Sequence, residues 1–195
     1  MIKLKKITFL ILALVVIAVY GCMNQSPVSF KDGIKRISQI DSKYGASIRS
    51  PPNESNKIDG FISELAAFKS SNKISEPLKS ILNFKMKFLE AEKLNAEGWQ
   101  WDRASTTEYG FGCKKGYQIV TQSAMLRNSS AQKGYEAVAI LQKFVDDYPD
   151  EAKSLNLTQK DVIVLNAIYY KIEEQAKRDS TIIHGMCRQE QNVSA

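Results

Sequence analysis

The sequence predicts an all-α protein, a bundle of four to five helices that follows an N-terminal signal or anchor helix. Three observations carry this prediction. Apolar residues recur every three or four positions over most of the chain, as they do on one face of an α-helix. Clusters of Pro, Gly, Ser and Asn divide the chain into pieces of helix length. No segment alternates apolar and polar residues over the length of a strand with turn residues at both ends.

The first element is an apolar run near the N-terminus. Lys3, Lys5 and Lys6 precede the uncharged residues 7–20, and polar residues follow shortly afterwards. This order is typical of a secretory signal peptide. As a helix the run would measure about 21 Å, which is short of the roughly 30 Å of a bilayer core. We therefore expect residues 1–21 to be a signal peptide or membrane anchor with a cytoplasmic N-terminus.

The run ends in Val19-Tyr20-Gly21-Cys22, which resembles the lipobox of prokaryotic lipoprotein signal peptides. Tyr20 departs from that pattern, because the family has a small residue there. The resemblance implies cleavage before Cys22 and a diacylglyceryl group on its sulfur, and a thiolate is a strong nucleophile for taking up a lipid. The alternative is an uncleaved signal anchor. Both place residues 23–195 on the extracytoplasmic face of a membrane.

The distribution of charge gives little support for a nucleic-acid partner. The formal net charge of the whole chain is +6, but residues 1–21 contain three Lys and no acidic residue. The rest of the chain has 24 basic and 21 acidic residues, a net charge of +3. No basic run longer than two residues follows residue 6. We therefore expect an ordinary mixed surface and no nucleic-acid binding.

The exported part is expected to form one helical domain over residues 33–187. Residues 22–32 are polar and contain one Pro, so they are expected to be a lipid-attached tether. Residues 188–195 are expected to be a polar tail. Helices are predicted around 34–40 and over about 56–70, 76–96, 114–147 and 159–184.

The second and third helices have clear sequence signals. Residues 56–70 carry apolar side chains at the i, i+3, i+4 and i+7 positions of an amphipathic helix. Ser75 followed by Pro77 marks the start of the next helix, because Ser caps helices and Pro is tolerated in a first turn. Lys85 falls on the apolar stripe of that helix, and we expect its ammonium group to extend to water.

The last two helices are bounded by equally local signals. Residues 114–147 fit one long helix with a kink near 128–131, and they also fit two helices broken there. Pro149 stops this helical segment. Thr158 with Asp161 three residues later resembles a capping box, with Asp in place of Glu or Gln. The final helix is therefore expected to begin at about residue 159.

Two cysteines remain once Cys22 is assigned to the lipid. In an exported protein an even pair favours a disulfide, here between Cys113 and Cys187. It would close a loop of about 75 residues and stabilise the fold by roughly 4 kcal/mol. The alternative is two independent thiols. No CxxC motif is present and His184 is the only imidazole, so we expect no metal site and no cofactor.

N-glycosylation is a second modification that the sequence suggests. The Asn-x-Ser/Thr pattern is more frequent than a Ser-rich chain would give by chance, although chance remains an alternative explanation. A glycan in the middle of a predicted helix would need an exposed helix break at that position. The candidate acceptors are Asn24, Asn53, Asn128, Asn156 and Asn192.

A weak family resemblance covers the second half of the chain. Lys133-Gly134-Tyr135-Glu136-Ala137, with the aromatic residues up to Tyr148-Pro149, resembles the second helix of a tetratricopeptide repeat. No copy recurs 34 residues away, so a repeat array is not expected. Together with Cys113 and Cys187, the pattern over about 76–187 is similar to small uncharacterised exported helical proteins of archaea. This resemblance implies an exported, helical, disulfide-linked protein and no particular activity.

The segment 97–112 is expected to be a Gly-rich loop that carries four aromatic residues. Aromatic side chains on such a loop form a binding surface for sugar, peptide or protein in one interpretation. In the other interpretation, which we favour, they fold back and close the bundle. The four residues are Trp99, Trp101, Tyr109 and Phe111.

No motif for catalysis is present, so the chain is predicted not to be an enzyme. The sequence lacks a nucleophile elbow, a phosphate-binding loop and an HExxH motif. We expect a membrane-anchored protein of the cell envelope that acts by binding a protein partner, as an adaptor or assembly factor. One alternative is a structural spacer without a specific ligand. Another is an envelope hydrolase that uses paired carboxylates, with Glu90, Glu92, Asp102 and Glu108 as candidates.

Overall fold

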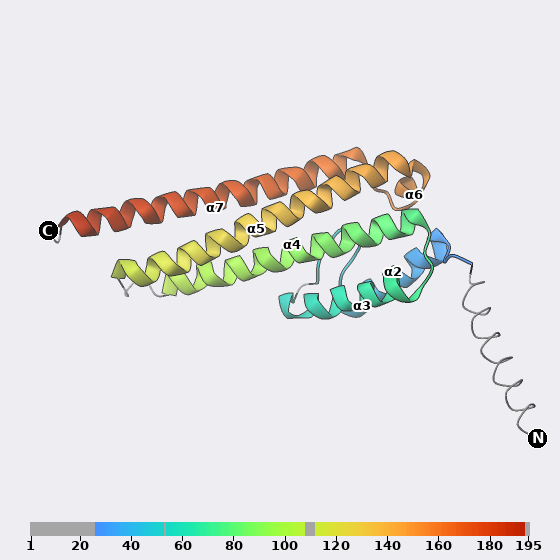
Figure 1. The fold of residues 1–195 in the computed structure, drawn as a ribbon, viewed down its shortest axis with the longest axis horizontal. Helices are drawn as coiled ribbons and strands as arrows, with labels where there is room; N and C mark the ends of the chain where they lie inside the picture. The colour runs from blue at the N-terminus through green and yellow to red at the C-terminus, as the bar shows by residue number, and fades with distance from the viewer. Residues whose placement is uncertain (1–25, 53, 108–111, 194–195) are drawn as a thin grey trace, which may run out of the picture.

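The structure is a computed structural model that describes residues 26–52, 54–107 and 112–193. The predicted all-α class is confirmed, because these residues form six α-helices and one short 3-10 helix, with no β-strand among them (Figure 1). The elements are α2 (Phe30–Tyr44), η1 (Ser55–Lys57), α3 (Ile58–Ser71), α4 (Glu76–Thr107), α5 (Gly112–Asp147), α6 (Pro149–Ser154) and α7 (Gln159–Val193).

The expected signal or anchor segment, residues 1–21, lies outside the described residues, as do Cys22 and Asn24. Within the part of the chain that is described, no helix combines the length and the apolar character needed to cross a membrane.

Three long helices dominate the architecture. α5 lies between α4 and α7, and successive helices run in opposite directions (Figure 1). α2 and α3 pack beside the N-terminal part of α4. The ammonium of Lys93 lies 2.8 Å from the carboxylate of Asp59, so the beginning of α3 is level with Lys93. Beyond that level α4, α5 and α7 continue without α3. We call these parts, residues 98–107, 112–127 and 179–193, the three-helix arm.

The core lies where the predicted apolar faces meet. Its fully or almost fully buried side chains are Ile37 and Ile40 of α2, Phe61 and Leu65 of α3, Leu78, Ile81 and Leu89 of α4, Leu141 and Phe144 of α5, and Val162 and Tyr169 of α7. Gly134 lets α5 and α7 approach each other closely. A Cβ atom at this position would lie 2.2 Å from Cδ1 of Tyr169, well inside any van der Waals contact.

One predicted interruption is absent, and the choice left open between one helix and two over residues 114–147 is decided. Residues 97–107 were expected to be a loop, but α4 is helical to Thr107. α5 is a single helix that continues through residues 128–131. Among the polar residues that suggested a break in α5, Ser130 is buried and donates its hydroxyl to the carbonyl of Ala91 on α4 at 2.8 Å.

The ends of the folded body also differ from the predicted boundaries. The backbone N–H of Val28 donates to the carbonyl of Lys73 at 2.7 Å, and Phe30 stacks near Phe144. The predicted tether, residues 22–32, is therefore packed against the bundle in its last part. At the other end, the predicted tail is helical up to Val193.

The turn between α6 and α7 contains one half of the predicted capping box, because the Asp161 carboxylate accepts the backbone N–H of Thr158, whereas the backbone N–H of Asp161 donates to the Thr158 carbonyl. Both the backbone N–H and the hydroxyl of Thr158 donate to the Asp161 carboxylate, at 2.8 Å each. The guanidinium of Arg49 lies 3.3 Å from this carboxylate and also donates to the carbonyl of Asn156. Arg49 belongs to the loop after α2, so this contact holds that loop against the start of α7. The short helix α6, which begins at Pro149, was not predicted.

Candidate binding surface

Trp99 and Trp101 are the most prominent exposed aromatic residues of α4. They remain 50% and 44% exposed, respectively. Both lie on α4 beyond the level where α3 begins, and η1 reaches this part of α4 at Ser55, whose hydroxyl accepts a hydrogen bond from Gln100 at 3.5 Å. The expectation that the aromatic residues fold back to close the bundle is therefore wrong for these two. Tyr109 and Phe111 lie outside the described residues.

Trp99 is fixed in place by a buried arginine. The guanidinium carbon of Arg127 lies 4.3 Å from the centre of the Trp99 ring, a cation–π geometry. Arg127 is only 1% exposed, and its Nη1 atom donates to the Asp179 carboxylate at 2.6 Å. One chain of contacts thus joins α4, α5 and α7. It leaves an indole ring that is held by the protein and still half open to solvent.

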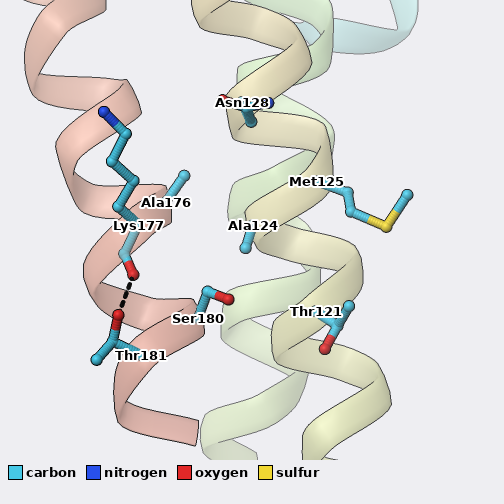
Figure 2. A pocket seen from close by; sticks show the side chains of 8 residues that line it. All are labelled: Thr121, Ala124, Met125, Asn128, Ala176, Lys177, Ser180 and Thr181. Atoms are coloured by element: carbon cyan, nitrogen blue, oxygen red, sulfur yellow. Dashed lines mark hydrogen bonds between the residues drawn. The ribbon is translucent and has the colours of Figure 1, made fainter. Parts of the chain in front are cut away.

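A shallow groove of about 430 Å³ lies on the arm and the adjoining stretch of helix, between α5 and α7. Figure 2 shows that Ala124 and Ala176 leave the space between the two helices open, with α4 behind, and that Met125 points away. The hydroxyl of Thr181 donates to the carbonyl of Lys177 at 2.9 Å. The groove is lined by Thr121, Ala124, Met125, Asn128, Ala176, Lys177, Ser180 and Thr181.

The groove offers little charge for recognition of a ligand. The ammonium of Lys177 lies 2.8 Å from the carboxylate of Glu173, one turn away on the same helix. Neither Trp99 nor Trp101 lines the groove. We therefore treat the two Trp residues, rather than the groove, as the candidate surface; because they are two residues apart on α4, their rings point in different directions and offer two separate contacts.

The described candidates for paired carboxylates do not face each other. Glu90 and Glu92 are two residues apart on α4, and side chains at this spacing point in different directions. Glu90 lies 3.0 Å from the ammonium of Lys87. Glu92 is partly buried and accepts a hydrogen bond from the Tyr169 hydroxyl at 3.1 Å. Burial raises the pKa of Glu92 above its usual value.

The other two carboxylates named from the sequence cannot be placed in this way. Glu108 lies outside the described residues, and so does the side chain of Asp102.

A buried ion pair, which sequence reasoning missed, joins α4 to α2. Lys85 does not reach water as expected: its side chain is 1% exposed, and its ammonium lies 3.3 Å from the carboxylate of Asp41. It also donates to the carbonyl of Ser47. Burial lowers the pKa of Lys85 to about 8 and raises the pKa of Asp41, so burial costs both groups more than their attraction returns. The pair is enclosed, and we assign it a structural role.

The proposed disulfide falls on residues whose side chains are not described. Cys113 lies in the first turn of α5 and Cys187 near the end of α7, at the same end of the arm (Figure 1). Because Arg127 is level with Asp179, Cys113 should be level with residue 193. Cys187 is then about 9 Å away along the axis. A disulfide needs Cα atoms about 4.4–6.8 Å apart, so it would require a shift of the helix ends.

Metal binding was not expected, and the side chain of His184 is likewise not described. Among the side chains that are described, no three His, Cys, Asp or Glu residues come together as a metal-binding group.

The sequons differ in their surroundings. Asn128 is exposed but lies within the continuous helix α5, so the helix break that a glycan there requires is absent. Asn156 is exposed in the turn before α7 and has a positive φ of 54°. Asn53 and the side chain of Asn192 are outside the described residues. Asn156 is therefore the better placed of the two described acceptors.

These features describe an all-α bundle with a projecting arm of three helices that exposes two Trp residues. Comparisons of the chain with protein-family models, with curated proteins and with solved structures find no match. The resemblances to lipoprotein signal peptides and to exported archaeal proteins therefore stay predictions from the sequence.

Proposed function

We propose that this chain is an exported helical protein, held at the extracytoplasmic face of a membrane by its N-terminus, that acts by binding a protein partner. The observation that carries the binding role is the exposure of Trp99 and Trp101 on the arm, with Trp99 stacked on the buried Arg127. The N-terminal pattern of the sequence supports the location.

The Trp pair has the properties of an interface anchor. A Trp side chain buries roughly 150–250 Å² when it is covered, and Trp and Arg are enriched among the residues that dominate binding energy. Stacking on Arg127 restricts the rotamers of Trp99 before any partner arrives. Less conformational entropy is then lost when the partner binds.

The position of the pair suits a protein tethered at its N-terminus. Val28 contacts the chain next to the beginning of α4, so the tether joins the bundle at that end. Trp101 lies 25 residues after Glu76 on the same helix, which corresponds to about 38 Å at 1.5 Å per residue. The arm would therefore present its Trp residues well away from the attachment point.

Two other functions were considered from the sequence. A carboxylate-dependent hydrolase finds no support in the described carboxylates, because Glu90 and Glu92 point apart and Glu92 is hydrogen-bonded to Tyr169. A spacer without a specific ligand needs no exposed aromatic anchor, so the Trp pair favours binding over this role.

Partner capture tests the binding role. The full chain, with an affinity tag, is recovered from solubilised envelope membranes, and the co-purified proteins are quantified. Because a central Trp typically contributes at least about 2 kcal/mol, we expect Trp101→Ala to weaken capture of a specific protein roughly 30-fold. The matched control is Lys143→Ala, at an exposed position of α5 outside the arm, and it should capture normally. Equal recovery with both variants would contradict the proposal.

Intact mass of the membrane-extracted protein tests the anchoring. We expect a chain that begins at Cys22 and carries a diacylglyceryl group. If Cys113 and Cys187 are bridged, reduction will add the mass of two hydrogens. A full-length mass would instead identify an uncleaved anchor, and recovery of the protein in the cytosol alone would contradict the proposed location.

A further inference from the structure

The outer face of α7 carries a cluster of uncovered apolar side chains, with the exposed polar residues Asn166 and Lys171 beside them. Seven large hydrophobic side chains are strongly exposed among the described residues, and four of them lie within eight consecutive residues of this helix. They are Ile163, Val164, Ile168 and Tyr170, and Ile163 is 67% exposed. The opposite side of the same turns is buried through Val162 and Tyr169. An exposed apolar cluster of this kind marks an interaction surface.

The spacing along this face is that of a helix-pairing stripe. Lys160, Ile163, Ala167, Tyr170 and Glu174 follow one another at intervals of three, four, three and four residues. These intervals are the a and d positions of a heptad, where two helices meet side by side. The stripe is about 21 Å long. The small Ala167 stands at its midpoint and permits the close approach of a second helix backbone.

We propose that the occupant of this face is a second copy of the chain, with the two α7 helices antiparallel and a two-fold axis at Ala167. Such an axis brings Ile163 of one copy beside Tyr170 of the other, because these residues lie four and three positions from Ala167 on opposite sides. The contact then repeats itself by symmetry, so both copies use the same surface and the assembly closes as a dimer.

The charges at the ends of the stripe select this orientation. Lys160 and Glu174 each lie seven residues, or about 10.5 Å, from Ala167, so the two-fold axis places Lys160 of one copy beside Glu174 of the other. A parallel pair would instead put Lys160 beside Lys160 and Glu174 beside Glu174. Within the described part of the chain Lys160 makes no ion pair, whereas Glu174 lies 3.3 Å from Lys177 on its own helix. Lys160 is thus available for a partner.

The proposed dimer is compatible with the rest of the fold. The stripe lies on the side of α7 that faces away from α5, so pairing disturbs neither Tyr169 nor the core. Because the helices are antiparallel, the two arms would point in opposite directions. The Trp residues of the two copies would then lie at opposite ends of the dimer. The dimer does not depend on the proposed binding role of those residues.

Charge reversal tests the pairing. The mass of the full chain is measured by sedimentation equilibrium in detergent, after subtraction of bound detergent, and we expect a dimer. Lys160→Glu and Glu174→Lys should each raise the dimer dissociation constant about tenfold, because each creates two repulsive contacts. The double variant restores opposite charges, so its dissociation constant should return to within about twofold of the wild type. Lys143→Glu, at an exposed position of α5, is the control and should leave it unchanged.

Crosslinking tests the position of the axis. Ala167→Cys places a thiol beside its own copy, so mild oxidation should give a reducible dimer of twice the chain mass. The native cysteines are present in every variant, so Lys143→Cys should give no more crosslinked dimer than the wild type.

A monomeric wild type would overturn the proposal. A dimer whose dissociation constant is unchanged by both charge reversals would overturn it as well. Monomers that bind lipid vesicles through Ile163 would assign the face to a membrane surface and would also overturn it. Helix content measured by circular dichroism confirms that each variant is folded.

Discussion

A single methyl group added at Gly134 should lower the stability of the fold strongly. A Cβ atom there would lie 2.2 Å from both Cγ and Cδ1 of Tyr169 and 2.4 Å from Cε1. Carbon atoms in contact are separated by about 3.5–4.0 Å, so the ring would have to move by more than about 1 Å. The ring is fully buried and its hydroxyl donates to Glu92, so it cannot move without disturbing this hydrogen bond.

The expected magnitude for Gly134→Ala combines three effects. Overpacking a well-packed core costs about 1–3 kcal/mol. Weakening the hydrogen bond between Tyr169 and the buried Glu92 costs about 1–3 kcal/mol more. Ala is about 1 kcal/mol better than Gly inside a helix, which offsets part of this loss. We therefore expect the free energy of unfolding to fall by about 3 kcal/mol.

Urea unfolding followed by circular dichroism measures this loss. Gly60→Ala is the matched control, because Gly60 is an exposed residue of α3 whose added Cβ would lie 3.3 Å from the hydroxyl of Tyr44 and in ordinary contact with its ring, at 3.6 and 3.8 Å. The control should be as stable as the wild type or gain up to about 1 kcal/mol. If Gly134→Ala were as stable as Gly60→Ala, the close approach of α5 and α7 at this point would be refuted.

The buried ionisable groups give two further predictions, both measured by urea unfolding as a function of pH. Lys85→Met leaves Asp41 buried without its counter-ion and should cost about 3–5 kcal/mol, whereas Lys85→Met combined with Asp41→Leu should be as stable as the wild type or more stable. The pKa of Lys85 falls from about 10.4 in the unfolded chain to about 8 in the folded protein. Between these two pH values the unfolded chain binds more protons, so the stability of the wild type should rise with pH. The stability of Lys85→Met should not show this rise. Burial raises the pKa of Glu92, so the stability that Glu92 contributes is fully present below about pH 4 and is lost as the pH rises through the raised pKa. Glu92→Gln should remove this decline of stability with pH. An unchanged pH profile in that variant would contradict the burial of Glu92.

Several elements of the fold could be predicted because their signals are local. The start of α7 follows from Thr158 and Asp161, which are three residues apart and contact each other as the capping pattern predicts. The apolar spacing of residues 56–70 likewise predicts α3, whose buried side chains include Phe61 and Leu65. In both cases the interacting residues lie within a few turns of one helix.

The C-terminal part of α4, which was predicted to be a loop, shows where local signals mislead. Gly98 and its neighbours suggested a loop, but the carbonyl of Gly98 accepts the buried hydroxyl of Ser123 at 2.9 Å. An added Cβ at Gly98 would lie 3.0 Å from Cγ of Arg127. Ser130 makes a similar bond to α4. Small and polar residues here allow helices to pack closely. In the sequence alone the same residues also indicate a turn, and only the neighbouring helix shows which of the two applies.

The candidate site depended even more on distant contacts. The sequence identified Trp99 and Trp101 as residues of interest, but their exposure depends on which neighbouring elements cover this part of α4. The contacts of Trp99 with Arg127, and of Arg127 with Asp179, join residues that are far apart in the chain. No spacing rule connects such residues.

By itself, then, the sequence determined the all-α class, the approximate course of the long helices and the expectation of export, since each of these rests on patterns within a short segment. The tertiary structure alone decided that Lys85 pairs with Asp41 instead of reaching water and that the apolar face of α7 around Ile163 stays uncovered. The physical reason is that burial depends on which helices pack together. Helical periodicity shows that a face is apolar, but not which surface, if any, covers it.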